Sequence, residues 1–434
     1  MFSRRLKIGY FILEGLNSFS TVYYFYYLFF FMQKVFGFGN KANLTVAALS
    51  GGIAVLAAWW GGKFAQRFGY FKALKLGFVT MMLALAVGLQ LESAPGQIIV
   101  MSLTVIGMCL TWPTLEALIS EGEPAHKVQH MVGLYNVVWA GTAALANFTG
   151  GAMLDKLGPH SLFFVPIAIL LSQLGLTLWL EAQALKGPKS VFENCRSRRK
   201  EALGAVEHPV KFEPPYVGSY DSQTHSKGFL RMAWLANPFA YIAINTVVAA
   251  MPSVASRLNL SITLAGFCCS VWCFSRLGAF FCLWFWDGWH YRFRWLLLSY
   301  LALAASFASI LLVRNLAVVV LAQIVFGAAA GLIYYSSLFY SMHRSETKGE
   351  HGGIHEAAIG LGNFAGPAVG ATALHFLPRS ANSGAWAVTA LLVLGLGGLV
   401  TVWQQAVRKS KAQSPKSKVQ SPDPEFAKRM VASE

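Results

Sequence analysis

Long apolar runs alternate with short polar connections along most of the chain. An α-helix needs about 20 apolar residues to cross the hydrocarbon core of a membrane, and most of the runs reach or exceed that length. The pattern therefore predicts twelve membrane-spanning helices with both chain ends on the same side. They lie near residues 8–31, 44–65, 73–92, 97–120, 129–153, 160–182, 229–253, 262–286, 294–313, 316–342, 352–376 and 384–405.

Two polar segments interrupt this pattern and divide the chain. The segment 183–228 holds eight Lys and Arg residues and lacks helical periodicity, so we interpret it as a basic cytoplasmic linker. It separates an N-terminal six-helix bundle, 1–182, from a C-terminal six-helix bundle, 229–405. The tail 406–434 is rich in Ser, Pro and Lys, a composition typical of a disordered cytoplasmic segment.

Composition agrees with an integral membrane protein and changes the interpretation of the charge. Of the residues, 55% are hydrophobic and 12% are charged, whereas soluble proteins carry about 25% charged residues. The net charge of +16 would suit a nucleic-acid partner. However, in the predicted topology 28 of the 35 Lys and Arg residues lie on the side of the chain ends and six on the other. This is the positive-inside bias of membrane proteins. It predicts a multi-pass protein of the inner (plasma) membrane, with both termini cytoplasmic, lipid neighbours and no nucleic-acid partner.

The cysteines and the N-terminus add no further structural element. Five of the six cysteines lie inside apolar runs and none has metal-ligand spacing, so we expect neither a metal site nor a disulfide framework. The basic N-terminus continues directly into the first apolar run without a small-residue cleavage site. We interpret this run as a retained helix.

A short basic signature follows the second apolar run. Gly62, Arg67 and Gly69 occur at the spacing of the Gly-x-x-x-Asp-Arg-x-Gly motif, and Lys72 follows. The stretch resembles the helix 2–3 loop of the major facilitator superfamily. Gln66 stands where the family usually has Asp, so the charge that locks one conformation in the family is weakened or moved in this chain.

The second half of the chain repeats features of the first. Asp287 and Arg292 follow the second apolar run of that half, and glycines are frequent in both fifth runs. The eleventh run carries Gly366 and Pro367 in a pattern similar to one that superfamily antiporters carry in their fifth helix. Because the pattern lies in the eleventh helix and not in the fifth, it does not identify the protein as an antiporter. The resemblance implies an all-α integral membrane fold, with twelve transmembrane helices in two pseudo-symmetric six-helix bundles.

The resemblance also implies a solute cavity lined mainly by the first and fourth helices of each half. Ionisable residues at membrane depth are costly, so each one is a candidate site residue. For the tyrosines and amides the alternative is a structural role between helices, worth about 0.6–2 kcal/mol each. The predicted substrate-binding residues are Glu14, Asn17, Tyr24, Trp112, Glu116, Asn136, Trp139, Asn245, Trp272, Arg276, Gln323 and Tyr335.

Arg276 is the one basic residue predicted deep inside an apolar run. A buried guanidinium needs an acidic partner, for which Glu14 and Glu116 are candidates, or an anionic ligand that it binds through paired hydrogen bonds. Both alternatives remain open from the sequence.

The remaining charged and glycine positions suggest a cytoplasmic gate. His351 and His355 are four residues apart beside Glu356, but a third metal ligand is missing, so a proton-sensitive gate is the better interpretation. By resemblance, Glu121 would pair with Arg67. The predicted gating and signature residues are Gly62, Gln66, Arg67, Gly69, Glu121, Asp287, Arg292, His355, Glu356, Gly366 and Pro367.

These observations predict a secondary active transporter of a small organic solute that works by alternating access, with protons as a candidate coupling ion. No nucleotide-binding loop and no catalytic motif occur in the sequence, so we expect no enzyme activity and no cofactor. The alternative is a non-transporting membrane sensor or assembly protein with the same fold. We expect a monomer. The sequence does not specify the solute, the direction of transport or the coupling mode.

Overall fold

The computed structural model describes residues 4–120, 125–186, 221–286, 288–342 and 348–413, and every regular element in these ranges is a helix. The predicted site residues Glu121 and Asp287 lie outside the described residues. The N-terminal half contains α1 (Arg4–Phe36), α2 (Asn40–Phe68), α3 (Tyr70–Gly88), α4 (Ala94–Ser120), α5 (Ala125–Lys156) and α6 (Ser161–Lys186). The C-terminal half contains α8 (Asp221–Arg257), α9 (Ile262–Cys269), α10 (Val271–Phe285), α11 (Phe293–Leu312), α12 (Leu316–Met342), α13 (Lys348–Phe376) and α14 (Ser383–Gln413).

Eleven of the twelve predicted membrane spans are recovered in the described part of the chain, and the first, α1, differs. In the described part of the chain, 11 spans are long and apolar enough to cross a membrane, with α9 and α10 together forming one of them. The helix α1 is long enough at 33 residues but is less apolar, because tyrosines, Glu14 and Asn17 lower its mean hydropathy. It packs against α4, α5, α6 and α8, so neighbouring helices surround much of its polar surface.

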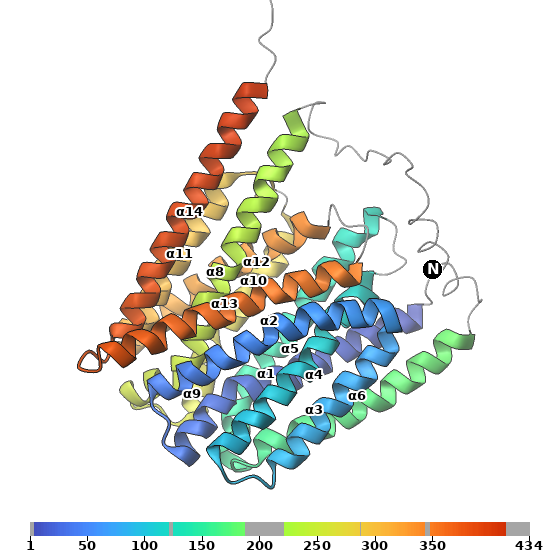
Figure 1. Cartoon of the computed structure of the whole chain (residues 1–434), viewed down its shortest axis with the longest axis vertical. Coiled ribbons are helices and arrows are strands. Elements are labelled where there is room, and N and C mark those ends of the chain that lie inside the picture. The colour runs from blue at the N-terminus through green and yellow to red at the C-terminus, as the bar shows by residue number, and fades with distance from the viewer. Residues whose placement is uncertain (1–3, 121–124, 187–220, 287, 343–347, 414–434) are drawn as a thin grey trace, which may run out of the picture.

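Both halves use the same helix pairs to build their cores. In the N-terminal half α1 packs on α5 and α6, α4 packs on α2 and α3, and α3 packs on α6. In the C-terminal half the equivalent pairs are α8 with α13 and α14, α12 with α10 and α11, and α11 with α14. This correspondence confirms the predicted fold of two pseudo-symmetric six-helix bundles, which lie side by side in Figure 1.

The halves meet along two seams, and glycines bring the backbones together in both. The helix α2 runs along α13 in the most extensive helix–helix contact of the structure, visible through the middle of Figure 1. On this seam Gly51 packs against the backbone of Asn363 and Phe364, where a Cβ atom would collide. The other seam joins α5 to α9 and α10, with Gly151 against the carbonyl oxygen of Ile262. Small residues allow such close approach of membrane helices.

The residues of the basic signature lie almost entirely within helices and not in a loop. The helix α2 extends to Phe68 and α3 begins at Tyr70, so the reversal is made at Gly69. Gly69 has φ +101° and ψ 146°, a conformation that residues with a side chain rarely adopt. The last glycine of the signature is therefore required by the backbone conformation of the reversal.

Other helix bounds differ from the apolar runs because hydropathy marks the membrane and not the helix ends. The helix α14 continues to Gln413, past the predicted tail boundary at 406, and α8 begins at Asp221, before the predicted linker end at 228. The eighth predicted span is divided at Ser270 into α9 and α10, a break that the apolar pattern did not indicate.

Candidate functional site

Aromatic side chains from both halves meet at the centre of the interface. The ring of Trp139 on α5 lies 5.4 Å from that of Tyr334 on α12, 5.6 Å from that of Phe280 on α10 and 6.0 Å from that of Trp112 on α4. The ring of Tyr241 on α8 lies 6.3 Å from that of Tyr334. We refer to Trp112, Trp139, Tyr241, Phe280 and Tyr334 as the aromatic cluster.

Arg276 on α10 lies beside this cluster, between two indole rings. Its guanidinium carbon is 4.5 Å from the ring centre of Trp139 and 4.7 Å from that of Trp272. Trp139 belongs to the N-terminal half and Trp272 to the C-terminal half, so the cation joins the two. Its Nε atom is buried without a hydrogen-bond partner. Of the two alternatives left open for Arg276, an ion pair with Glu14 or Glu116 is not formed among the described residues, and the guanidinium instead lies over the two indole rings.

Three carboxyl groups lie near the aromatic cluster, and two of them, Glu116 and Glu356, interact electrostatically with Tyr241 and Tyr334. Glu14 on α1, Glu116 on α4 and Glu356 on α13 are close enough to interact electrostatically with one another, although no group of described residues is compact enough to hold a metal ion. Glu14 is fully buried, and its Oε1 atom accepts a hydrogen bond of 3.0 Å from Ser18, while Oε2 has no partner in the described part of the chain.

Tyr334 links the carboxyl groups to Arg276. It interacts electrostatically with Glu116, Glu356 and Arg276, and its ring lies 5.6 Å from that of His355. Buried His355 has no hydrogen-bond partner at Nε2. His355 and Glu356, which the sequence places in a gate, therefore lie beside the central cluster. We refer to the aromatic cluster, Arg276 and the three carboxyl groups as the central site.

Several predicted amides instead connect helices within one half. Asn17 accepts a 3.3 Å hydrogen bond from Thr111 on α4, and Asn245 on α8 donates one of 2.8 Å to the carbonyl oxygen of Asn363 on α13. Asn136 accepts a 3.0 Å bond from the indole of Trp139. The last bond orients a ring of the central site, so Asn136 is a positioning residue.

The other predicted binding residues occupy different surroundings. Tyr24 packs within the N-terminal half against Phe163 of α6, with ring centres 6.3 Å apart. Tyr335 contacts the central site through Phe280, whose ring centre is 6.0 Å away. Gln323 is fully buried on α12, and both polar atoms of its amide lack a hydrogen-bond partner among the described residues.

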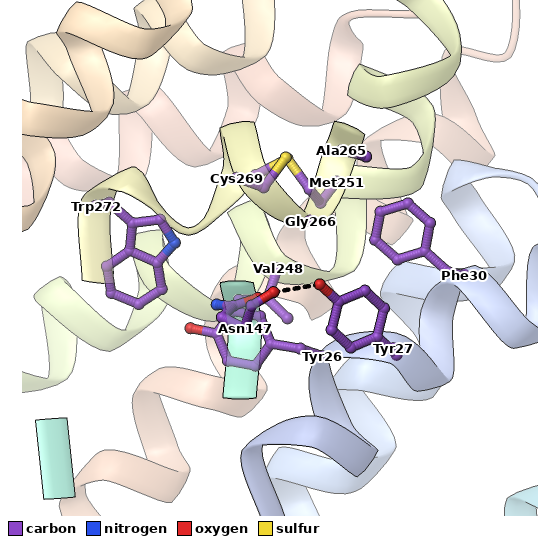
Figure 2. Close-up of a pocket in the computed structure, with 10 residues that line it drawn as sticks. All are labelled: Tyr26, Tyr27, Phe30, Asn147, Val248, Met251, Ala265, Gly266, Cys269 and Trp272. Atoms are coloured by element: carbon purple, nitrogen blue, oxygen red, sulfur yellow. Dashed lines mark hydrogen bonds between the residues drawn. The ribbon is translucent and has the colours of Figure 1, made fainter. Parts of the chain in front are cut away.

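A small cavity lies between the halves next to Trp272 (Figure 2). Its volume of about 10 Å3 suits roughly one water molecule. Around it, Tyr27 donates a hydrogen bond to the carbonyl oxygen of Asn147, whose side chain donates one of 3.2 Å to Cys273. Tyr26 stacks on Trp272 with ring centres 6.1 Å apart. These contacts lie toward the C-terminal ends of α1 and α5. They close the interface between the halves on the side opposite to the chain termini.

Two further polar contacts close the same face. Thr263 lies in α9, and its side chain donates a 2.9 Å hydrogen bond to Asp155 of α5. Lys41 at the start of α2 lies 3.0 Å from the ring nitrogen of His375 at the end of α13. Each joins one half to the other, so we refer to this face as the closed face.

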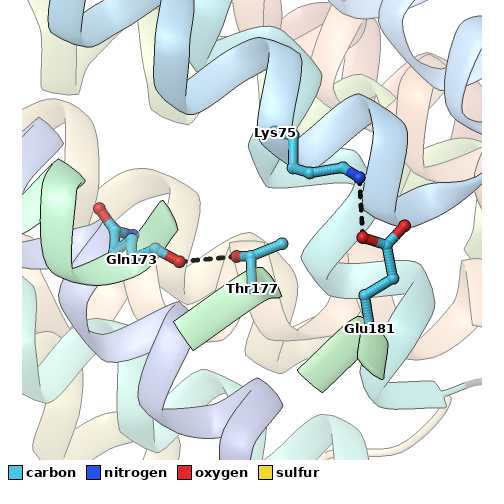
Figure 3. A network of polar contacts seen from close by, with 4 residues as sticks. All are labelled: Lys75, Gln173, Thr177 and Glu181. Atoms are coloured by element: carbon cyan, nitrogen blue, oxygen red, sulfur yellow. Dashed lines mark hydrogen bonds and ion pairs between the residues drawn. The ribbon is translucent and has the colours of Figure 1, made fainter. Parts of the chain in front are cut away.

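On the opposite face, polar contacts hold the N-terminal half together. Lys7 of α1 donates a 2.9 Å hydrogen bond to the carbonyl oxygen of Ile119 near the end of α4, where helix carbonyls lack partners. Lys75 of α3 and Glu181 of α6 form an ion pair of 2.7 Å, shown in Figure 3 near Gln173 and Thr177.

The signature residues contribute no charge contact between the halves among the described residues. Gln66 and Arg67 are exposed; Gln66 accepts a 3.3 Å hydrogen bond from Tyr70, and Arg67 lies over the ring of Phe68. Gly62 is buried on α2, and Arg292 is exposed immediately before α11. Gly366 packs closely against Ile242 of α8, and Pro367 lies inside α13.

Some residues of the central interface were not identified as site residues from the sequence. Tyr26, Phe280 and Cys273 lie in apolar or aromatic runs, where nothing in the spacing separates a residue of the interface from one facing lipid. Ionisable residues gave the stronger signal, because a charge inside an apolar run is unusual.

Comparison with known proteins identifies the same family as the signature. Residues 1–147 match the family described as Major Facilitator Superfamily. No curated protein matches the chain significantly. A crystal structure of a mutant of the nucleoside transporter NupG is similar with a TM-score of 0.63 and 14% sequence identity, covering 93% of this chain and 99% of that one.

A second similar structure is a bacterial homologue of the human lysosomal transporter Spinster, in an inward-facing and unoccupied conformation. Its TM-score is 0.59 at 13% identity, with 94% of this chain and 98% of that chain covered. At these identities the structures establish the fold, and the sequence match is confined to the N-terminal third. The chain is therefore a multi-pass membrane protein with the fold of these transporter structures, and its first 147 residues match the model of the Major Facilitator Superfamily.

Proposed function

We propose that the protein is a secondary active transporter that carries a small organic solute by alternating access of its two halves. The observation that carries this proposal is the central site, where charged and aromatic side chains of both halves converge inside an apolar protein. Charged groups at membrane depth are retained where they bind or move a solute or an ion. The two proteins of similar fold are both described as transporters, one of them for nucleosides.

The distribution of basic residues supports a cytoplasmic location for both termini, and we propose the plasma membrane or bacterial inner membrane as the site of action. In this orientation the closed face is the outer one. Opening it requires separating Lys41 from His375 and Thr263 from Asp155.

Proton coupling is a further part of the proposal, and it rests on Glu14 and Glu116. Burial away from water favours the neutral form of a carboxyl group, whereas a nearby cation favours the charged form. Binding and release of a charged solute would therefore alter how many protons these groups hold. If transport driven by a pH gradient is unchanged in both Glu14→Gln and Glu116→Gln, coupling through these residues is excluded.

Alternating access can be tested before the solute is known. Spin labels at Lys41 and His375, both exposed, report the separation of the halves on the closed face. Labels at Arg67 of α2 and Arg231 of α8, also exposed, report it on the opposite face. Both pairs are introduced into a variant without native cysteines and reconstituted in liposomes.

We expect two distance populations at each pair, and conditions that lengthen one distance should shorten the other. A single distance at both pairs under every lipid, pH and ligand condition would contradict alternating access. It would instead favour the non-transporting sensor.

A further inference from the structure

We propose that the central site selects solutes with an organic ammonium head attached to an apolar body. This inference rests on the proposed transport function and adds the class of its substrate. It follows from the juxtaposition of three carboxyl groups with the faces of the aromatic cluster.

The first argument is the balance of charge. Glu14, Glu116 and Glu356 share the site with Arg276, so acidic groups outnumber the guanidinium. Carboxyl groups buried away from water are stable when they hold a proton or face a cation. An ammonium group supplies both the positive charge and N–H donors.

The second argument is an unused acceptor on one of these carboxyl groups. The Oε1 atom of Glu14 accepts a hydrogen bond from Ser18, but its Oε2 atom is fully buried and has no partner among the described residues. An unpaired buried acceptor is costly, and a ligand donor would remove that cost. Glu14 and Glu356 belong to different halves and interact electrostatically with each other, so an ammonium group near them would be attracted by both halves.

The third argument is the aromatic wall. The faces of aromatic rings are electron-rich and attract organic cations, and their area suits the apolar part of such a solute. Trp139, Phe280 and Tyr334 lie within 5.7 Å of one another, centre to centre, and Tyr334 interacts with two of the carboxyl groups. An amine on an aromatic or alicyclic skeleton could thus use both features together.

Arg276 defines what a second polar group on the solute would contact. Its guanidinium lies over two indole rings, and both Tyr241 and Tyr334 interact electrostatically with it and with Glu116 and Glu356. A solute that also carries a carboxylate could direct it toward this guanidinium. The proposal requires an ammonium group on the solute. Two classes of solute carry one, simple amines and amino acids.

The test uses matched ligands that differ only in the head group. Thermal stability of the purified protein is measured with phenethylamine, 3-phenylpropionate and 2-phenylethanol. The amine–carboxylate comparison is repeated with tryptamine and indole-3-propionate and with 1-adamantanamine and 1-adamantanecarboxylate. Phenylalanine tests whether a solute carrying both charges is accepted. Ligands that bind only the native state raise the melting temperature.

We expect at least one amine to bind about tenfold or more tightly than its matched carboxylate. One favourable charge contact changes the dissociation constant by about this factor. The preference should fall about tenfold in the Glu14→Gln/Glu356→Gln variant. The matched control is Glu181→Gln, which removes a carboxylate of the N-terminal half whose partner is Lys75, and the preference should persist there. Stabilisation by phenylalanine beyond phenethylamine that is lost in Arg276→Gln would identify amino acids as the source of the ammonium.

Three results would overturn the inference: stabilisation by a carboxylate or the alcohol equal to that by the amine, no stabilisation by any amine, or an unchanged preference in the double glutamate variant. The spin-label distances separate this failure from failure of the proposed function. If both pairs still alternate, the protein is a transporter for another class of solute.

Discussion

Adding one methyl group to Gly51 tests the seam between α2 and α13. A Cβ atom at this position would lie 2.7 Å from the carbonyl oxygen of Asn363 and closer still to the amide nitrogen of Phe364, whereas ordinary contact begins at 3.4 Å. Both neighbours are backbone atoms that cannot rotate away. The helices must therefore separate by about 0.7 Å or more, and overpacking of this kind costs about 1–3 kcal/mol.

Gly52 provides a matched control on the next residue of the same helix. A Cβ atom there would lie 3.4 Å from the ring of Phe364, which is ordinary van der Waals contact with a side chain. Both substitutions to alanine gain the same intrinsic helix propensity, about 1 kcal/mol. The difference between Gly51→Ala and Gly52→Ala therefore isolates the cost of the collision.

The assay is thermal unfolding of the two variants in the same detergent, followed by tryptophan fluorescence. We expect Gly51→Ala to melt below Gly52→Ala by an amount that corresponds to about 1–3 kcal/mol. Equal melting temperatures would refute the conclusion that backbone contact at Gly51 holds the halves together.

Three further predictions follow from contacts outside the central site. Arg257 donates hydrogen bonds to the last carbonyl groups of α11, so Arg257→Met should lower the free energy of unfolding by about 1–3 kcal/mol, whereas Arg314→Met at an exposed position should have little effect in the same melting assay. The ion pair of Lys75 and Glu181 is partly exposed, at 31% and 27%, so a double-mutant cycle should give a coupling energy of about 1 kcal/mol that decreases in high salt. Replacing residues 187–220 with a Gly–Ser linker of equal length should leave solute flux unchanged in liposomes. If neither the native protein nor this variant transports solute, and the variant loses a cellular response, the sensor is favoured.

The fold was predictable because hydropathy and charge act over whole segments. Twelve apolar runs, a basic division in the middle and the signature at Gly62, Arg67 and Gly69 identify the architecture. The break at Ser270 could not be predicted in this way, since both sides of it are apolar. Likewise, hydropathy does not report where α14 continues as a helix beyond the membrane.

The candidate site was only partly predictable. Glu14, Glu116 and Arg276 stand out in the sequence as charges inside apolar runs, and the structure brings all three into the same region. Their partners do not follow from the sequence, because position along a helix does not specify rotation toward the other half. For this reason the sequence left the partner of Arg276 open, whereas the structure places its guanidinium over two indoles. Likewise, Glu356, expected in a gate, interacts electrostatically with the other carboxyl groups.

The glycine seam also bears on how far such a protein can diverge. Where two helices touch through their backbones, the contact depends on the absence of side chains at a few positions, such as Gly51 and Gly151. The residues that face lipid are constrained only to be apolar, so they can exchange freely over evolutionary time. The two structures of similar fold share only 13–14% of their sequence with this chain. Searches for distant relatives of this chain would therefore gain more from the spacing of its glycines than from its overall similarity.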